Sequence, residues 1–233
     1  NFLMADDCLS TIHCFRQMGI DIEQSDYITI HGKGLKGLKK PSKALDVGNS
    51  GTTIRLLSGI LCGQEFPSMI SGDHSIEQRP MNRIIMPLRQ MNANIAASRE
   101  DTYAPLHIKP STLESTVYHS PVASAQIKSA VLLAGLYAEG DTSVIEPSLS
   151  RNHTELMLTG FGATVNSRNK KATVKGQPSL YGLDINVPGD ISSAAFFIVA
   201  ALIIPHSELY IKNVGINPTR SGIITVLNEM GAC

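Results

Sequence analysis

The chain has 233 residues, 42% of them hydrophobic, a length and composition that allow at least one buried core. Its 20 basic and 20 acidic residues cancel, which argues against a general nucleic-acid binder, although a local group of Arg and Lys can still hold a phosphorylated small molecule. No apolar run reaches the roughly 18 residues that a membrane-spanning helix needs, so neither nucleic acid nor membrane is an expected partner.

The cysteines, the histidines and the chain ends indicate what kind of protein this is. Cys8, Cys14, Cys62 and Cys233 form no C-x-x-C pair, which favours reduced thiols in a cytoplasmic protein. The seven histidines lack metal-binding spacing, so we expect no metal site. The start resembles no signal peptide and has no initiator methionine, and we expect a chain truncated at both ends.

Helical and strand patterns alternate along the chain. Apolar residues at helical spacing predict helices, and short apolar or alternating runs bounded by turn residues predict strands. In chain order we expect a helix at 7–18, strands at 27–31 and 44–47, a helix at 50–63, a strand stretch at 66–72, a helix at 123–140, a strand stretch at 143–147, helices at 154–162 and 190–207, and a strand stretch at 208–214.

Two landmarks recur with a period of about 70 residues. The first is a helix end followed by Gly, or once by Asn92, residue types that adopt the left-handed conformation after a helix. Its copies are 73, 70 and 69 residues apart and lie at Met18, Met91, Phe161 and Met230. The second is the start of a helix rich in small residues, with spacings of 74 and 68 residues between Gly51, Ala125 and Ser193.

Each unit therefore reads strand, helix, strand, helix, strand, strand. The predicted fold class is α/β (α+β), with repeated βαβαββ units that pack together around their helices because no single unit can bury itself. No G-x-G-x-x-G follows a strand, so a dinucleotide-binding fold is not expected. By the same register, the first unit lacks its start and the last stops after its second helix.

A Gly/Ser/Thr turn at residues 48–55 leads into the helix at 50–63. Free backbone N–H groups and the positive end of the helix dipole suit a phosphate or carboxylate there, and the alternative is a simple capped helix. The Gly-rich stretch at 32–37 lacks the G-K-[ST] ending of a P-loop and predicts a turn between strands.

Four more residues near predicted helix starts can contact an anion. Arg79 precedes a proline that can begin a helix, and its guanidinium can bind carboxylate or phosphate through two hydrogen bonds, unless it is simply a solvated surface residue. Ser124 and Gln126 lie in the first turn of the helix at 123–140, where Ser124 can also be a plain cap. Arg151 lies near a positive helix end and needs an anionic partner.

Together these motifs resemble the 5-enolpyruvylshikimate-3-phosphate (EPSP) synthase family in order and spacing over the whole chain. The residues that carry the resemblance are 49–52 with Arg55, 79–81, 123–126, Arg151 and 188–193. It implies an inside-out α/β barrel of six βαβαββ units, three in each domain. Ala125, where many members have Ser, and Arg151, where many have Tyr, match a variant form of one bacterial branch.

The resemblance implies transfer of the enolpyruvyl group of phosphoenolpyruvate to the 5-hydroxyl of shikimate 3-phosphate, without metal or organic cofactor. This is a step of aromatic amino-acid biosynthesis. Asn49, Gly51 and Thr52 would border the phosphoenolpyruvate pocket, which glyphosate also occupies in this family. Arg79 would clamp the anionic groups, and Arg55 would support the loop.

The shikimate 3-phosphate side is implied in the same way. Ser124, Ala125 and Gln126 would hold its phosphate, with Gln126 also facing the second substrate. Arg151 would stack against or pair with the shikimate moiety.

The resemblance also implies a division of the chain. Residues 1–188 would form the first domain without its start, and residues 189–233 would begin the second, with a hinge at 188–190. The family's N-terminal Lys-Ser-x-x-x-Arg segment would precede Asn1, and its acid–base groups would follow Cys233. We therefore expect no catalytic residue in this chain and no activity as it stands. We also expect a monomer.

Two alternatives remain open from the sequence. The related UDP-N-acetylglucosamine enolpyruvyl transferase is built from the same repeats, but it usually carries a reactive cysteine, and no cysteine lies near Arg79. A non-catalytic ligand-binding fragment is the second alternative.

Overall fold

The structure is a computed structural model that describes residues 2–232, so Cys233, the end of the last repeat copy, lies outside the described residues. The helices are α1 (Asp6–Gln17), α2 (Gly51–Cys62), α3 (His74–Glu77), α4 (Asn82–Gln90), α5 (Ser98–Asp101), α6 (Ala125–Gly135), α7 (His153–Gly160), α8 (Ile191–Ile203) and α9 (Gly222–Glu229). The strands are β1 (Asp21–Gln24), β2 (Ile28–His31), β3 (Leu45–Asp46), β4 (Ser68–Ser71), β5 (Asn94–Ala97), β6 (Tyr103–Lys109), β7 (Val117–His119), β8 (Asp141–Ile145), β9 (Val165–Arg168), β10 (Lys171–Lys175), β11 (Gly189–Asp190) and β12 (Val214–Gly215).

Two four-stranded sheets have the same topology. The first has the order β3-β4-β6-β5 and the second the order β7-β8-β10-β9. In each, the first two strands are parallel and joined through a helix, and the remaining neighbours are antiparallel. The predicted βαβαββ unit is confirmed, because both sheets arise from strand, helix, strand, helix, strand, strand.

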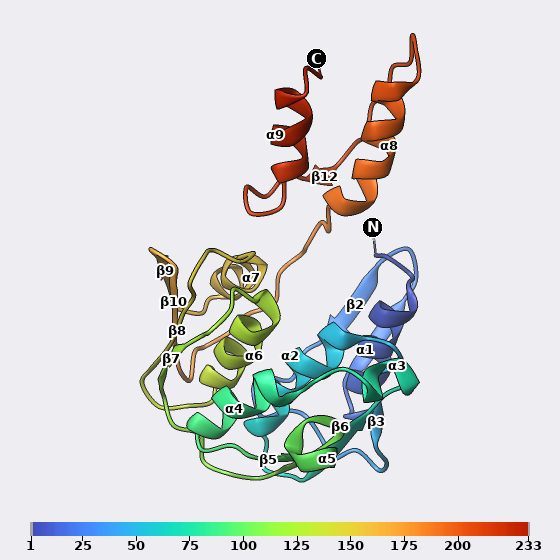
Figure 1. Cartoon of the computed structure of the whole chain (residues 1–233). Coiled ribbons are helices and arrows are strands. Elements are labelled where there is room, and N and C mark those ends of the chain that lie inside the picture. Colours follow the sequence, from blue (N-terminus) through green and yellow to red (C-terminus); the bar gives the residue numbers. More distant parts are fainter. Residues whose placement is uncertain (1, 233) are drawn as a thin grey trace.

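Helices α2 and α6 lie between the two four-stranded sheets (Figure 1). Helix α2 packs closely on α6, and the two share one core cluster with the buried faces of both four-stranded sheets. Close approach of the two helices requires Gly59, because a Cβ there would lie 2.2 Å from the carbonyl oxygen of Ala130. This packing brings together the N-terminal ends of two helices that belong to different repeat units.

The predicted helix ends are confirmed by the backbone. The residue after the helix has φ of +82° at Gly19, +65° at Asn92, +96° at Gly162 and +91° at Gly231. The left-handed conformation is the one that ends a helix while satisfying its last carbonyls, so it recurs in every copy of the repeat.

Three predicted elements differ by several residues from those observed. The helix predicted at 190–207 is α8, which ends at Ile203 because Pro205 disfavours helical backbone in the residue before it. Helix α6 ends at Gly135, not near residue 140, because Tyr137 and Ala138 donate to carbonyls only three residues back and so form turns. The strand predicted at 208–214 is reduced to β12, which in residues 2–232 pairs with β11 and has no second neighbour. Without a second neighbour, the backbone of 208–213 has no ladder to join.

Residues 189–232, the C-terminal segment, lie apart from the rest of the chain and follow residues 178–188, which form neither helix nor strand (Figure 1). A hydrogen bond from Asn217 Nδ2 to Asn152 Oδ1, 2.7 Å, connects the segment to the larger part. Within the described residues, no helix combines the length and apolar character that crossing a membrane requires.

Candidate active site

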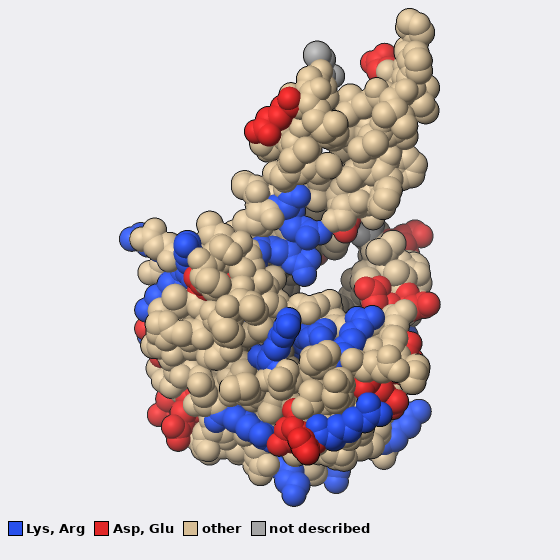
Figure 2. Space-filling view, viewed as in Figure 1, with Lys and Arg blue, Asp and Glu red and all other residues tan. Residues whose placement is uncertain are grey.

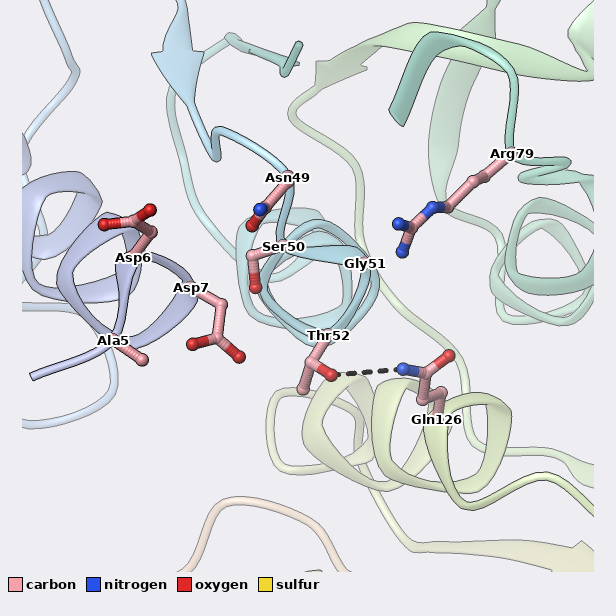
Figure 3. Close-up of a pocket in the computed structure, with 9 residues that line it drawn as sticks. All are labelled: Ala5, Asp6, Asp7, Asn49, Ser50, Gly51, Thr52, Arg79 and Gln126. Atoms are coloured by element: carbon pink, nitrogen blue, oxygen red, sulfur yellow. Dashed lines mark hydrogen bonds between the residues drawn. The ribbon is translucent and has the colours of Figure 1, made fainter. Parts of the chain in front are cut away.

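A pocket of about 440 Å³ opens at the N-terminal end of α2 (Figure 3). Its walls come from the start of α1, the turn into α2, the segment after α3 and the first turn of α6. The lining residues are Ala5, Asp6, Asp7, Asn49, Ser50, Gly51, Thr52, Arg79 and Gln126. Five of the eight residues predicted to bind substrate are among them: Asn49, Gly51, Thr52, Arg79 and Gln126.

The turn into α2 is held by short-range hydrogen bonds. Asp46 Oδ1 accepts from the backbone N–H of Gly48 at 2.8 Å, and Ser50 Oγ accepts from the N–H of Thr53 at 3.1 Å. The first N–H groups of an α-helix have no intrahelical acceptor. Helix α2 therefore points its positive end, with free donors, into the pocket.

Arg79 is tied to the same turn through the backbone. The N–H of Asp73 donates to the carbonyl of Gly48 at 2.9 Å, and Asp73 caps α3 by accepting from Ile76. Arg79 follows directly, and its own N–H donates to the carbonyl of Ile76 at 3.0 Å. The guanidinium thus reaches the pocket from a loop whose position is fixed relative to α2.

Gly51 lies between two guanidinium groups. A Cβ built on Gly51 would be 2.7 Å from Nη1 of Arg55 and 2.7 Å from Nη1 of Arg79. Arg55 donates to the carbonyl of Gly51 at 2.9 Å, as a supporting role predicts. Burial, followed by the positive charges of Arg79 and Arg83, lowers the pKa of Arg55. Like charges gathered at one helix end favour binding of an anion.

Gln126 joins two repeat units at the pocket. Its Nε2 donates to Thr52 Oγ1 at 3.1 Å, between residues 74 positions apart (Figure 3). Both residues stand in the first turn of their helices, α6 and α2. Equivalent positions of two successive units therefore meet, and the N-terminal ends of α2 and α6 lie close together.

Ser124, Ala125 and Arg151 are not among the described residues that line this pocket. Ser124 caps α6, accepting from the N–H of Ile127 at 3.5 Å, and Ala125 is the first residue of that helix. Arg151 is half-buried in the segment before α7. Figure 2 shows Lys and Arg side chains facing the hollow between the larger part of the chain and the C-terminal segment.

Asp6 and Asp7, which are not among the predicted site residues, also line the pocket. Acidic residues are common in the first turn of a helix because they interact favourably with the helix dipole. Their presence in a sequence therefore does not indicate a functional site. Their position follows from packing of α1 on α2, where Thr11 Oγ1 and Thr53 Oγ1 are 2.6 Å apart. No spacing rule connects the two helices.

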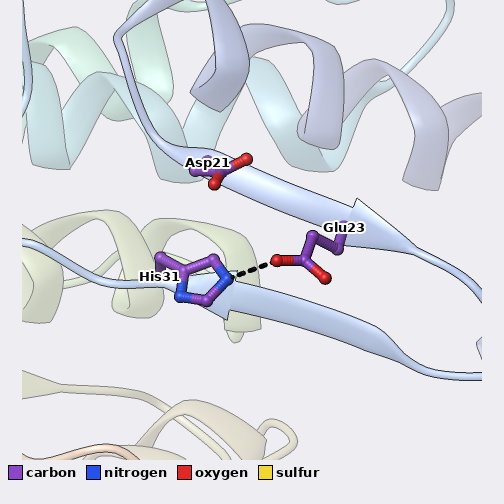
Figure 4. A group of neighbouring side chains, drawn as sticks. All are labelled: Asp21, Glu23 and His31. Atoms are coloured by element: carbon purple, nitrogen blue, oxygen red, sulfur yellow. Dashed lines mark hydrogen bonds and ion pairs between the residues drawn. The ribbon is translucent and has the colours of Figure 1, made fainter.

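Three side chains of types that bind metals lie together on the β1–β2 hairpin (Figure 4). Antiparallel register places Asp21 opposite His31, and the ligand atoms of Asp21, Glu23 and His31 are within 4.8 Å of one another. All three are exposed, and a 2.9 Å hydrogen bond between His31 Nε2 and Glu23 Oε1 accounts for the closest contact. Exposed groups of this kind are common without a bound ion.

Comparison with known proteins identifies the family. The family model described as EPSP synthase (3-phosphoshikimate 1-carboxyvinyltransferase) matches residues 1–233. The chain is 57% identical over 232 residues to the 3-phosphoshikimate 1-carboxyvinyltransferase of Bacillus thuringiensis (strain Al Hakam), covering 99% of the chain and 54% of that protein. It is 56% identical over 233 residues to the protein of the same name from Bacillus cytotoxicus, covering all of the chain and 55% of that protein.

A solved structure agrees with the curated relatives. The EPSP synthase from Acinetobacter baumannii superposes with a TM-score of 0.93 at 49% identity, over 99% of this chain and 53% of that one. The chain thus spans about half the length of the relatives it matches. The repeated βαβαββ units, the family model over every residue and these relatives together place the chain in the EPSP synthase family.

Proposed function

We propose that the protein containing this chain transfers the enolpyruvyl group of phosphoenolpyruvate to the 5-hydroxyl of shikimate 3-phosphate. The observation that carries the proposal is the pocket at the start of α2, where Gly51 lies between the guanidinium groups of Arg55 and Arg79. Phosphoenolpyruvate bears a phosphate and a carboxylate, which are the groups that guanidinium and helix N-termini bind. The names of the curated relatives support this reaction.

Each residue of the pocket that is predicted to bind phosphoenolpyruvate has a role in this proposal. Asn49, Gly51 and Thr52 border phosphoenolpyruvate, and their backbone N–H groups face its anionic end. Arg79 holds the phosphate and stabilises the negative charge that builds up as it leaves. Arg55 supports the turn through the carbonyl of Gly51.

Shikimate 3-phosphate is assigned to the start of α6. Ser124, Ala125 and Gln126 hold its phosphate at the positive helix end, and Arg151 contacts the shikimate moiety. Gln126 already reaches Thr52, so it lies where the two substrates would meet.

The chain alone supplies binding groups and no acid–base residue in this proposal, so we expect no turnover in a phosphate-release assay. Turnover after removal of any contaminating full-length enzyme would contradict this division of roles. We further propose a cytoplasmic monomer, consistent with the free thiols of Cys8, Cys14 and Cys62. The UDP-N-acetylglucosamine alternative gains no support, since no cysteine is among the described residues that line the pocket.

Calorimetry on the chain tests the binding roles. Shikimate 3-phosphate is titrated with and without phosphoenolpyruvate, and shikimate without its phosphate serves as the ligand control. We expect binding that requires the phosphate and is strengthened by phosphoenolpyruvate. Arg79→Met should abolish the strengthening and leave shikimate 3-phosphate binding in place, whereas Arg168→Met on the exposed strand β9 should change neither.

A further inference from the structure

A lysine and two glutamates form a buried charged cluster beside the start of α6. Lys128, Glu146 and Glu155 are 3%, 4% and 3% exposed. Lys128 Nζ lies 3.0 Å from Glu146 Oε2 and 2.8 Å from Glu155 Oε1. Buried charges carry a large desolvation cost that only close pairing offsets, so this arrangement depends on all three members.

The cluster connects three elements of one repeat unit. Lys128 belongs to α6, Glu146 directly follows β8, and Glu155 lies in α7. Helices α6 and α7 also meet through Ser129 Oγ and Thr154 Oγ1, 2.6 Å apart. The positions of the two helix N-termini are therefore coupled to each other through side chains.

The same atoms reach the residues assigned above to shikimate 3-phosphate. Glu146 Oε1 accepts from the backbone N–H of Ser124 at 3.1 Å, while its other oxygen pairs with Lys128. Lys128 Nζ lies 3.5 Å from the carbonyl of Ser150, the residue before Arg151. One buried cluster therefore touches the chain at Ser124 and immediately beside Arg151.

Its contribution is one of position and not of charge attraction. Two carboxylates and one ammonium leave a net negative charge, which would not draw a phosphate toward α6. Glu155 Oε2 has no hydrogen-bond partner among the described residues, so Glu155 depends on Lys128 for compensation. What the cluster supplies is a fixed distance between the α6 cap and the loop that carries Arg151.

We propose that Lys128, Glu146 and Glu155 are positioning residues of the shikimate 3-phosphate subsite, holding Ser124 and the 150–151 loop in their binding geometry. The inference rests on the proposed function for the identity of the ligand. A group that only stabilises the fold would alter unfolding without altering this subsite selectively.

Three variants of the chain separate position from stability. Glu146→Leu removes the acceptor for Ser124, whereas Glu146→Gln keeps an oxygen at the same place and should rescue it. The variant Lys128→Met/Glu146→Leu/Glu155→Leu replaces the whole cluster by apolar groups, a change that often preserves or raises stability. Lys36→Met, in the exposed 2.8 Å pair with Glu65, is the control.

Calorimetry with shikimate 3-phosphate is the first measurement. We expect an affinity loss of about tenfold for Glu146→Leu and at least as much for the triple variant, with most of the affinity kept in Glu146→Gln and all of it in Lys36→Met. A folded triple variant with unchanged affinity would overturn the proposal. If the unmodified chain binds no shikimate 3-phosphate, the proposed ligand is wrong. A second measurement, which needs no ligand, then tests whether the cluster holds Ser124 and the 150–151 loop in place.

Amide hydrogen exchange is the second measurement and needs no ligand. Exchange at Ser124 and across residues 148–153 should become faster in Glu146→Leu and in the triple variant, while exchange across residues 49–52 stays as in the unmodified chain. Equal acceleration in both regions, or none in either, contradicts a local positioning role.

Discussion

At the scale of single residues, Gly51 allows the backbone to lie close to the two guanidinium groups of the pocket. The guanidinium groups of Arg55 and Arg79 occupy the space that any side chain at this position would need. Both are the far ends of flexible side chains, so they would move aside before the backbone did. A side chain at residue 51 should therefore damage the anion site more than the fold.

Gly51→Ala tests this directly. Overpacking by one methyl costs about 1–3 kcal/mol, so we expect the affinity for phosphoenolpyruvate in the presence of shikimate 3-phosphate to fall about tenfold or more. In the complete enzyme, inhibition by glyphosate should weaken further than substrate binding, because the longer molecule has less room to shift. Gly182→Ala is the matched control, since a Cβ there meets nothing within 4 Å. Unchanged constants would remove Gly51 from the site.

Two buried thiols and a partly buried phenol predict that the protein loses stability at alkaline pH. Burial raises the pKa of Cys62 from 9.0 to about 12 and that of Tyr137 from 10.0 to about 12, and burial followed by Asp46 raises that of Cys14 to about 11. The stabilising contribution of these protonated groups is complete below pH 9 and is lost as pH rises toward about 12, because the unfolded chain releases its protons first.

Urea unfolding at about pH 8 and about pH 10.5 should show this decrease in the free energy of unfolding. The variant Cys62→Ala will be less stable at both values, but its stability should depend less on pH across this range. An equal pH dependence in variant and unmodified chain would exclude Cys62 as a contributor.

At the scale of elements, the start of α2 depends on Ser50. Its Oγ accepts from the N–H of Thr53 and lies 2.7 Å from Thr53 Oγ1, which in turn contacts Thr11 of α1. One cap therefore joins the helix start to the neighbouring helix, and its loss should affect both stability and the shape of the pocket.

Ser50→Ala should lower the free energy of unfolding by about 1–2 kcal/mol, the usual cost of a lost N-cap. Urea denaturation measures the change, and Ser167→Ala on the exposed strand β9 is expected to have no effect. A midpoint equal to that of the unmodified chain would mean that water replaces the Ser50 hydroxyl without cost.

At the scale of the whole molecule, the C-terminal segment has little core of its own. Phe196, Phe197 and Ile203 of α8 are 80%, 63% and 74% exposed, and Met230, the fourth copy of the repeat landmark, is 77% exposed. Met18 and Met91, at the equivalent positions of earlier units, are fully buried. We propose that residues 1–188 form one domain and that residue 189 begins another.

Hydrogen exchange across the chain tests this boundary. Amides of α8 and α9 should exchange faster than those of α2 and α6, because few buried apolar contacts protect them. The core helices serve as the internal reference within the same sample. Equal protection on both sides of residue 188 would contradict the boundary.

Features that depend on neighbours along the chain could be predicted from the amino-acid sequence. Helix ends at Gly19 and Asn92, the cap at Ser50 and the period of about 70 residues follow from local backbone preferences and hydrophobic spacing. The motifs around Gly51 and Arg79 were recognisable for the same reason, since each is contiguous and adjoins a predicted helix start.

Which of these segments meet could not be predicted, because it depends on how the folded chain packs. Contact between Thr52 and Gln126, entry of Asp7 into the pocket, and the burial of Lys128 between Glu146 and Glu155 join residues far apart in sequence. Such contacts arise from the packing of α6 on α2, of α1 on α2, and of α6 on α7 and the loop after β8. Lys and Glu in a sequence normally indicate solvent exposure. The lengths of α6 and β12 were likewise set by the turns and strands available beside them, which no local pattern records.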